Sequence, residues 1–458
     1  MGKGNKSLVG YDWKVFLVLA VSLNIVLISK VVYQKDGGQE NKIGMLCVDA
    51  ESGKYGDVHV ETPSPTTISS NDVHNDIGDV GDGADHSDAH VIIDLDHGNP
   101  TMYEEYWRQM GDKTTIVIPG WQFISYFSDK NNICWFMEPD FAKAATRLHN
   151  LVGNAATQDR YMVVGTGSSQ LYQAVLYALT ATDNSKPMSV VSAAPFYSAY
   201  PVLTDLLKSG LHKWAGDAHN YSTTEPYIEI VTSPNNPDGS TRRSVSSGDK
   251  RILIHDLAYY WPQYTPITHG ADEDITLFTM SKSTGHAGTR IGWALVKDPE
   301  IAKKMTRYIE ISTIGVSKDS QLRAAKILQT LSDQYNTTNN AEGQEKFFDY
   351  SYNVMLKRWK ELRAAVDNNE KFSLPKFSPD NCTFRGQSFE PQPAFAWLKC
   401  EDESVDDCAS FLRGHNILGR SGKYFGSSPK YVRISMTDSN YKFKILTKRL
   451  AGLKSLDI

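Results

Sequence analysis

Four polar residues have types and spacings that suit one kind of chemistry. Lys282 lies among small hydroxyl and glycine residues, Arg290 follows it, and Asp256 and Asn236 stand upstream. A pyridoxal 5′-phosphate (PLP) enzyme needs an amine for a Schiff base, an anion for the ring nitrogen, a donor for the phenolic oxygen and a cation for the phosphate. Together these residues predict a PLP site.

Asp256 ends the apolar run 251–255, which has the composition of a buried parallel strand. An open α/β sheet places its ligand at the carboxyl ends of such strands. A carboxylate there would stabilise a protonated pyridinium ring, which accepts electrons from the substrate's α-carbon. Alone, Asp256 could equally begin an ordinary loop, but its spacing from Lys282 and Asn236 favours the cofactor role.

Lys282 follows the apolar, strand-like segment 275–280, which indicates a buried rather than a solvated side chain. We expect burial and a cationic cofactor to lower the pKa of its amine, so that it can form the Schiff base and then act as a base. Arg290 has the planar guanidinium that suits a phosphate, although a surface salt bridge is the alternative.

A glycine-rich turn lies between the apolar run 161–164 and a predicted helix over 170–179. Backbone amides at the start of that helix, with the hydroxyls of Ser168 and Ser169, would bind a phosphate. The turn has neither the full dinucleotide glycine pattern nor a P-loop lysine, so it does not indicate a nucleotide site.

Aromatic residues provide further candidates. Tyr259, with Asn236, could donate a hydrogen bond to the phenolic oxygen, and Tyr197 could stack on the pyridine ring, because a flat aromatic face suits a flat cofactor. Core packing is the alternative for Tyr197. Trp121 and Tyr126 could line the substrate pocket or belong to the core of a small domain.

From about residue 94 to the C-terminus, the chain resembles the fold-type I PLP aminotransferases. Within them it is most similar to the tryptophan aminotransferase-related group of the plant alliinase C-terminal family. The match is carried by residues 96–101 (DHGNPT), 125–129 (SYFSD), 153–155 (GNA), 165–168 (GTGS), 235–239 (NNPDG), 255–262 (HDLAYYWP), 281–286 (SKSTGH) and 431–435 (YVRIS).

The resemblance implies a role for each matching residue. Lys282 would form the Schiff base, Asp256 would pair with the pyridinium, and Tyr259 and Asn236 would donate to the phenolic oxygen. Arg433 would bind the substrate α-carboxylate by a bidentate pair. The phosphate would be held by Ser168, Ser169, Thr279 and Arg290. In a homodimer, Tyr126 would reach the phosphate of the neighbouring subunit's cofactor.

The resemblance also implies the reaction. It is transamination of L-tryptophan, or another aromatic L-amino acid, with a 2-oxo acid such as pyruvate, which gives indole-3-pyruvate for auxin synthesis. C–S β-elimination, as in the alliinases, is the alternative within the family. The cysteine-rich module that precedes the catalytic part of alliin-cleaving enzymes is not recognisable here, which favours transamination. A non-catalytic PLP-fold binding protein is the alternative of another class, but Lys282 and Asp256 are both intact.

Composition agrees with a large enzyme. The chain has 458 residues, 40% of them hydrophobic, and a net charge of −5, so nothing indicates a nucleic-acid partner. Its five cysteines are scattered and form no Cys-x-x-Cys pair. This pattern predicts mostly free thiols and no metal site.

Two segments precede the catalytic part. Residues 1–33 contain the apolar run 15–29, which approaches the roughly 20 residues that cross a bilayer, and we expect a retained single-pass anchor in the endoplasmic reticulum membrane. A cleavable signal peptide is the alternative. Residues 34–89 are polar and acidic, which predicts a flexible linker. Lysines flank the apolar run on both sides and leave its orientation open, while three glycosylation sequons are usable only in the lumen.

The remaining sequence predicts an α/β fold. A large domain at 152–329 would hold a doubly wound, mostly parallel sheet, with strands at 161–164, 189–192, 227–232, 251–255, 275–280 and 291–295. A smaller α/β domain would combine 90–151 with 330–458. The charged pattern at 340–368 predicts a helix that links the two.

Overall fold

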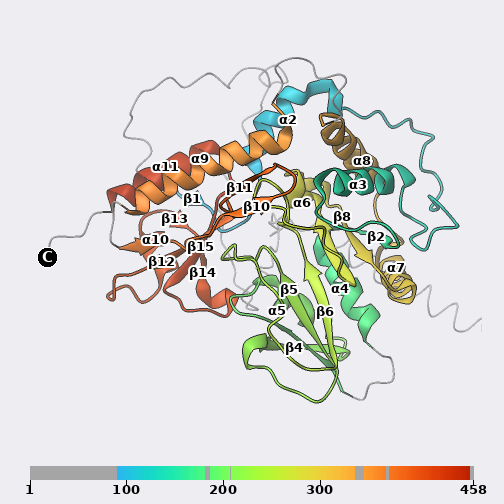
Figure 1. Cartoon of the computed structure of the whole chain (residues 1–458), viewed down its shortest axis with the longest axis horizontal. Coiled ribbons are helices and arrows are strands. Elements are labelled where there is room, and N and C mark those ends of the chain that lie inside the picture. Colours follow the sequence, from blue (N-terminus) through green and yellow to red (C-terminus); the bar gives the residue numbers. More distant parts are fainter. Residues whose placement is uncertain (1–89, 181–185, 207, 336–344, 368–370, 454–458) are drawn as a thin grey trace, which may run out of the picture. The chain divides into compact units, whose positions relative to one another are not determined.

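A computed structural model describes residues 90–453 apart from 181–185, 207, 336–344 and 368–370 (Figure 1). The predicted membrane anchor at 1–33 and the predicted linker at 34–89 therefore lie outside the described residues. Among the helices of the described ranges, none combines the length and the apolar composition that a bilayer span requires.

The larger sheet has seven strands within the described ranges, in the order β2-β8-β7-β6-β5-β3-β4. Their bounds are β2 (Tyr161–Gly165), β3 (Met188–Ser192), β4 (His212–Asp217), β5 (Tyr227–Thr232), β6 (Arg251–Asp256), β7 (Ile275–Thr279) and β8 (Gly292–Val296). Neighbours pair in parallel except at β8, which is antiparallel to both β2 and β7. The prediction of a mostly parallel sheet is confirmed, and β4 is an edge strand that was not predicted.

Helices pack in pairs beside this sheet. Helix α3 (Pro139–Val152) packs against α8 (Lys318–Asp333), and α4 (Gly167–Leu179) packs against α7 (Pro299–Thr313). The short α5 (Ala199–Asp205) contacts β4, and α6 (Met280–Ser283) follows β7 directly. Helix α4 begins at Gly167, three residues before the predicted start, so Ser168 and Ser169 lie in its first turn.

A second sheet has four antiparallel strands in the order β14-β15-β12-β9. Its strands are β9 (Phe372–Ser373), β12 (Phe395–Cys400), β14 (Arg420–Ser421) and β15 (Tyr431–Ser435). Helices α9 (Phe347–Asp367) and α11 (Asn440–Gly452) lie side by side along it (Figure 1). Helix α9 confirms the helix predicted over 340–368 from residue 347 onward, and its role as a link between two domains stays a prediction.

The first described strand joins the C-terminal part of the chain. Strand β1 (Ile93–Asp94) pairs in parallel with β13 (Ile417–Leu418). The short helices α2 (Glu104–Met110) and α10 (Cys408–Gly414) and the hairpin of β10 (Asp380–Cys382) and β11 (Gln387–Phe389) complete this part. The predicted domain boundaries at residues 90, 151 and 329 stay predictions.

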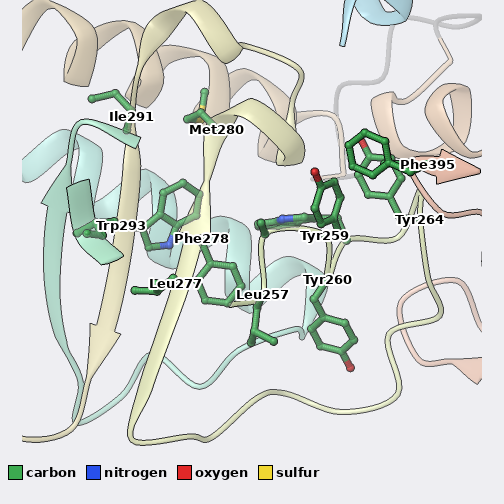
Figure 2. Packing of buried hydrophobic residues seen from close by; sticks show 14 of the residues in the cluster. Leu257, Tyr259, Tyr260, Tyr264, Leu277, Phe278, Met280, Ile291, Trp293 and Phe395 are labelled. Carbon is green, nitrogen blue, oxygen red and sulfur yellow. The ribbon is translucent and has the colours of Figure 1, made fainter. Parts of the chain in front are cut away.

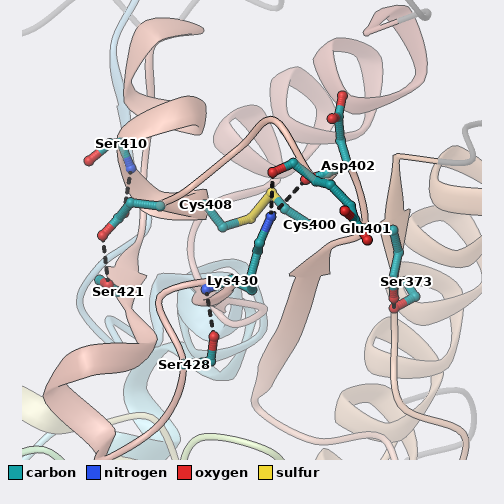
Figure 3. The surroundings of a disulfide bond; sticks show 11 residues. Ser373, Cys400, Glu401, Asp402, Cys408, Ser410, Ser421, Ser428 and Lys430 are labelled. Atoms are coloured by element: carbon teal, nitrogen blue, oxygen red, sulfur yellow. Dashed lines mark hydrogen bonds between the residues drawn. A yellow bond between two sulfur atoms is a disulfide. The ribbon is translucent and has the colours of Figure 1, made fainter.

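The expectation of mostly free thiols is wrong for one pair. Cys400 ends β12 and Cys408 begins α10, and the two form a disulfide (Figure 3). The connection between these elements turns back, which brings their Cα atoms to 5.6 Å. Cys134 and Cys382 are free and buried.

Large aromatic side chains fill the core around the segments that carry the candidate residues (Figure 2). Phe278 and Trp293, on the neighbouring strands β7 and β8, stack with ring centroids 5.9 Å apart. The indole N–H of Trp293 donates to His149 Nε2 at 2.9 Å, and burial lowers the pKa of His149 to about 4. A neutral histidine thus satisfies a buried indole donor without placing a charge in the core.

Candidate active site

Lys282 lies in α6, one turn beyond the end of β7. Its Nζ donates a hydrogen bond to the carbonyl oxygen of Gly98 at 2.7 Å. A Cβ atom at Gly98 would lie 2.7 Å from Phe395 and 3.0 Å from Lys282 Nζ, so the approach requires glycine. Loss of water around the amine, with the positive charges of Arg433 and Arg290, lowers the pKa of Lys282 to about 7. At neutral pH much of this amine is therefore an uncharged nucleophile.

Three side chains that were not predicted fix the backbone at Lys282. The hydroxyl of Tyr264 and the amide Nε2 of Gln263 both donate to the Lys282 carbonyl oxygen, each at 3.2 Å. The hydroxyls of Tyr264 and Tyr103 lie 2.9 Å apart. Because these groups are buried, they hold the main chain of Lys282 in place.

Asp256 ends β6, and its carboxylate is buried. Oδ2 accepts a hydrogen bond from the Tyr200 hydroxyl at 2.8 Å, and Oδ1 accepts one from the Ala258 amide at 3.1 Å. Burial raises the pKa of Asp256, and the two hydrogen bonds oppose that rise. No cation forms an ion pair with this carboxylate in the described part of the chain. A positive group placed beside it would remove much of the cost of burying it.

Arg433 lies in β15 with its guanidinium between the rings of Phe395 and Phe425, at 4.2 and 5.0 Å from their centroids. One terminal nitrogen donates to Asn236 Oδ1 at 3.0 Å, and the other donates to the Asp96 carbonyl oxygen. Within the described residues, its buried Nε has no hydrogen-bond partner.

Burial and the nearby charge of Arg420 lower the pKa of Arg433 to about 10. Arg420 itself is paired with the Asp96 carboxylate through Nε at 2.6 Å and a terminal nitrogen at 3.0 Å. Arg433 is thus a buried cation that still has a free donor, which fits an incoming carboxylate.

Tyr259 lies between these groups. Its ring centroid is 5.8 Å from Lys282 Nζ, and its ring packs against Tyr264 and Phe395 (Figure 2). Tyr197 meets Tyr200 edge to face, with ring centroids 5.3 Å apart. Burial raises the pKa of both Tyr259 and Tyr197, so their hydroxyls remain protonated and can donate hydrogen bonds.

A third group of residues gathers at the start of α4. Gly167 has φ +72°, and a Cβ atom there would lie 2.4 Å from a terminal nitrogen of Arg290. Arg290 donates to the Ala287 carbonyl at 2.9 Å and to Ser281 Oγ at 3.4 Å. Thr279 Oγ1 in turn donates to Ser281 Oγ at 3.2 Å. A guanidinium, several hydroxyls and a helix N-terminus therefore face one region, which suits a phosphate.

The model of the family described as "Allinase" matches residues 93–454. This chain belongs to the alliinase family. It is 53% identical to tryptophan aminotransferase-related protein 2 of Arabidopsis thaliana over 445 aligned residues. The alignment covers 96% of this chain and 97% of that protein. It is 36% identical to alliin lyase 1 of Allium sativum over 358 aligned residues. That alignment covers 76% of this chain and 72% of that enzyme.

Solved aminotransferases share the fold of this alliinase-family chain. An aminotransferase from Staphylococcus aureus matches with a TM-score of 0.56 at 19% identity, covering 79% of this chain and 93% of that one. A Thermus thermophilus aspartate aminotransferase variant matches with a TM-score of 0.55 at 16% identity, covering 79% and 91%. The fold is thus the α/β fold of the fold-type I aminotransferases, as predicted.

The cofactor of this alliinase-family chain is PLP. The residues fit it: Asp256 is a buried carboxylate without an ion-pair partner among the described residues, and Lys282 has an amine whose pKa is about 7. The start of α4, with Ser168, Ser169 and Arg290, matches its phosphate. The ring centroid of Tyr259 lies 5.8 Å from Lys282 Nζ and near the charge of Asp256, and Tyr197 lies near the charges of Asp256 and Arg290.

Two predicted residues are not packed into this cluster. Trp121 is 75% exposed and Tyr126 is 69% exposed, and both belong to a segment in which Val117 and Ile124 are also exposed. A single chain therefore leaves both rings on its surface.

Sequence reasoning missed Tyr200, Ser281 and Asp96 as individual contributors. Tyr200 lies in α5, whereas Tyr197 precedes that helix, so no periodic spacing in the sequence indicates that the two rings meet. Asp96 and Ser281 lie inside matching motifs, but nothing in their spacing indicates their partners.

Proposed function

We propose that the chain is a PLP-dependent aminotransferase that moves the amino group of L-tryptophan, or another aromatic L-amino acid, to a 2-oxo acid such as pyruvate. The observation that carries the proposal is a free donor on a buried, aromatic-flanked arginine, Arg433, beside the Lys282 amine. The high identity to a tryptophan aminotransferase-related protein supports the choice of substrate. The product would be indole-3-pyruvate, a precursor for auxin synthesis.

Asp256 and Tyr200 set the electrostatics of the site. When bound, PLP withdraws electrons from the substrate's α-carbon, so that the α-proton becomes acidic. The buried Asp256 carboxylate would keep the ring nitrogen protonated, and the Tyr200 hydroxyl holds that carboxylate in place. Tyr259 and Asn236 would donate hydrogen bonds to the cofactor's phenolic oxygen.

Lys282 performs the proton transfer. Its Nζ, with a pKa of about 7, accepts the proton from the substrate Cα and carries it to the cofactor side. Because Tyr264 and Gln263 fix its main chain, only the side chain has to move. The Gly98 carbonyl, which accepts a hydrogen bond from the amine, orients it between transfers.

Arg433 and the surrounding rings select the substrate. Its guanidinium binds the α-carboxylate, with Nε and a terminal nitrogen as donors. Phe395 and Phe425 flank that guanidinium, and Tyr259 packs on Phe395. An indole or phenyl side chain would find apolar, aromatic surfaces here.

A cysteine sulfoxide lyase is the second candidate, because alliin lyase 1 is 36% identical over most of its length. The two reactions are separated by incubating the purified protein with L-tryptophan and pyruvate, and separately with a cysteine sulfoxide. Transamination yields indole-3-pyruvate and alanine. Release of pyruvate and ammonia from the sulfoxide alone refutes the proposal. Lys282→Ala should abolish the product, whereas Lys303→Ala, at an exposed lysine, serves as the matched control.

We further propose a homodimer in which Tyr126 contacts the cofactor phosphate of the neighbouring subunit. The exposed apolar side chains of Val117, Trp121, Ile124 and Tyr126 support it, because such a cluster favours burial against a partner. The membrane anchor at 1–33 and the endoplasmic reticulum location remain part of the proposal. Mixing Lys282→Ala with Tyr126→Ala chains should restore activity if sites are shared, since mixed dimers then contain one site with both residues intact.

A further inference from the structure

Three surface and core features play no part in the proposed reaction. One is the Cys400–Cys408 disulfide, and the others are the two described sequons, Asn220-Tyr221-Ser222 and Asn381-Cys382-Thr383. Each bears on the compartment in which the catalytic part folds.

The disulfide lies inside the smaller sheet region rather than on the surface. Cys400 is 2% exposed and Cys408 is fully buried. Lys430, just before β15, binds the Cys400 end of this connection: its main-chain carbonyl oxygen accepts from the Cys400 amide at 2.8 Å, and its Nζ donates to the Asp402 carbonyl at 2.9 Å (Figure 3). At the other end, the Cys408 amide donates to the Pro429 carbonyl at 2.9 Å. The fold thus holds the two thiols together, and their state depends on the redox compartment.

The Asn381 sequon lies on the β10–β11 hairpin. Asn381 pairs with Ser388 and is exposed, whereas its neighbour Cys382 is buried and its sulfur accepts a hydrogen bond from the Ile267 amide at 3.3 Å. Strand alternation therefore turns the asparagine outward and the cysteine inward. A sugar on Asn381 would enter solvent and leave the core unchanged.

The Asn220 sequon follows edge strand β4. Asn220 and Ser222 are both exposed, and the Asn220 side chain has a long contact of 3.4 Å to Asp217. A sugar here also meets no packed neighbour. Both sequons are therefore exposed at the asparagine and at the hydroxyl residue, as the modification requires.

We propose that Asn220 and Asn381 carry N-linked glycans and that the catalytic part folds in the oxidising lumen of the secretory pathway, with Cys400 and Cys408 bonded. In the modification, the asparagine Nδ2 bonds the anomeric carbon of a lipid-linked oligosaccharide, loses a proton and displaces the donor's diphosphate. In the oxidation, the two thiols lose two protons and two electrons to the disulfide of a lumenal oxidoreductase, which is reduced to a dithiol.

The glycan test uses the full chain expressed in plant cells. Membranes are treated with endoglycosidase H, and the mobility of the protein is compared before and after treatment. We expect an increase in mobility, and we expect Asn220→Gln and Asn381→Gln each to remove one step. Asn353→Gln changes an exposed asparagine on α9 that is not in a sequon and should remove none. Asn336→Gln is included because the third sequon, Asn336-Thr337-Thr338, lies outside the described residues.

The thiol test uses the same membranes, prepared in an alkylating agent and digested without reduction. Because neither lysine nor arginine lies between them, trypsin leaves both cysteines on one peptide, and mass spectrometry should find that peptide unalkylated and two hydrogens lighter than the dithiol. Recovery of both as alkylated thiols overturns the proposal, as does a mobility that endoglycosidase H leaves unchanged. A step that survives Asn220→Gln or Asn381→Gln overturns the assignment of that site. Activity of the protein toward tryptophan has no influence on any of these readouts.

Discussion

The hydrogen bond between Tyr200 and Asp256 permits a quantitative test of the buried carboxylate. Tyr200 and Tyr172 are both buried, their rings stack with centroids 5.2 Å apart, and each hydroxyl contacts a threonine hydroxyl at 2.7 Å. Only Tyr200 also donates to a carboxylate, at 2.8 Å. The two tyrosines thus differ mainly in one charge-assisted hydrogen bond.

We expect Tyr200→Phe to destabilise the cofactor-free protein more than Tyr172→Phe does. A hydrogen bond to a charged group contributes about 1.5–3 kcal/mol, and one between neutral groups contributes about 0.5–1.5 kcal/mol. The expected excess for Tyr200→Phe at pH 7.5 is therefore about 1 kcal/mol or more. Urea unfolding followed by tryptophan fluorescence measures it, provided that both variants keep the wild-type slope.

The pH dependence of this excess follows from Asp256. Burial raises the pKa of its carboxyl above the unfolded value, so the stability linked to it is present in acid and is lost as the pH rises through the folded pKa. Tyr200 lowers the folded pKa of Asp256, so Tyr200→Phe increases the loss of folding stability at neutral pH. The excess should therefore shrink in acid. Equal losses for both variants at pH 7.5, or an excess that grows in acid, would refute the charged state of Asp256 and the role of Tyr200.

Three further predictions concern Lys282, Arg433 and the disulfide. Because the pKa of Lys282 is lowered from 10.5 to about 7, its amine is neutral above that pH. The rate at which cofactor-free protein captures PLP, measured by stopped-flow absorbance, should therefore rise with pH to a plateau with a midpoint near pH 7. A rate that still rises beyond about pH 9 contradicts this. Arg433→Lys should raise the KM for the amino acid about ten- to a hundredfold, with less change in kcat, because the variant loses one charged hydrogen bond to the substrate. Arg413→Lys, at an exposed arginine, should have no effect on steady-state kinetics. Reduction of Cys400–Cys408 should lower the free energy of unfolding by roughly 2–3 kcal/mol in urea titrations, and an unchanged midpoint would count against the crosslink.

Much of the larger sheet was predictable because its strands are short, apolar and buried. The prediction for β5 (Tyr227–Thr232) agrees at both ends, and the other five predicted strands agree to within one residue at each end. Strand β4 (His212–Asp217) was missed because it is an edge strand of half-buried residues with a glycine in it, and it lacks the apolar run on which the prediction depends.

The parts of the site that the sequence did not reveal depend on contacts between distant segments. Lys282, Asp256 and Asn236 stand in recognisable motifs at the ends of strands, so their proximity follows from a parallel sheet. The Gly98 carbonyl beside Lys282 and the Asp96 carbonyl beside Arg433 are backbone groups, which carry no compositional signal. The Cys400–Cys408 pair was equally hidden, because it depends on how the chain turns back after β12.

The guanidinium of Arg433 is dehydrated before any substrate arrives. In the described part of the chain no carboxylate lies within ion-pair distance of it, and its Nε donor is unused. An aromatic amine that has lost its carboxyl group would leave this buried cation without a counter-charge and its Nε without an acceptor. Sites that leave a polar group unpaired in this way discriminate by factors of about 10⁴ or more. Tryptamine and similar amines should therefore be excluded by an electrostatic penalty, even though their rings match the aromatic walls as well as those of the amino acids.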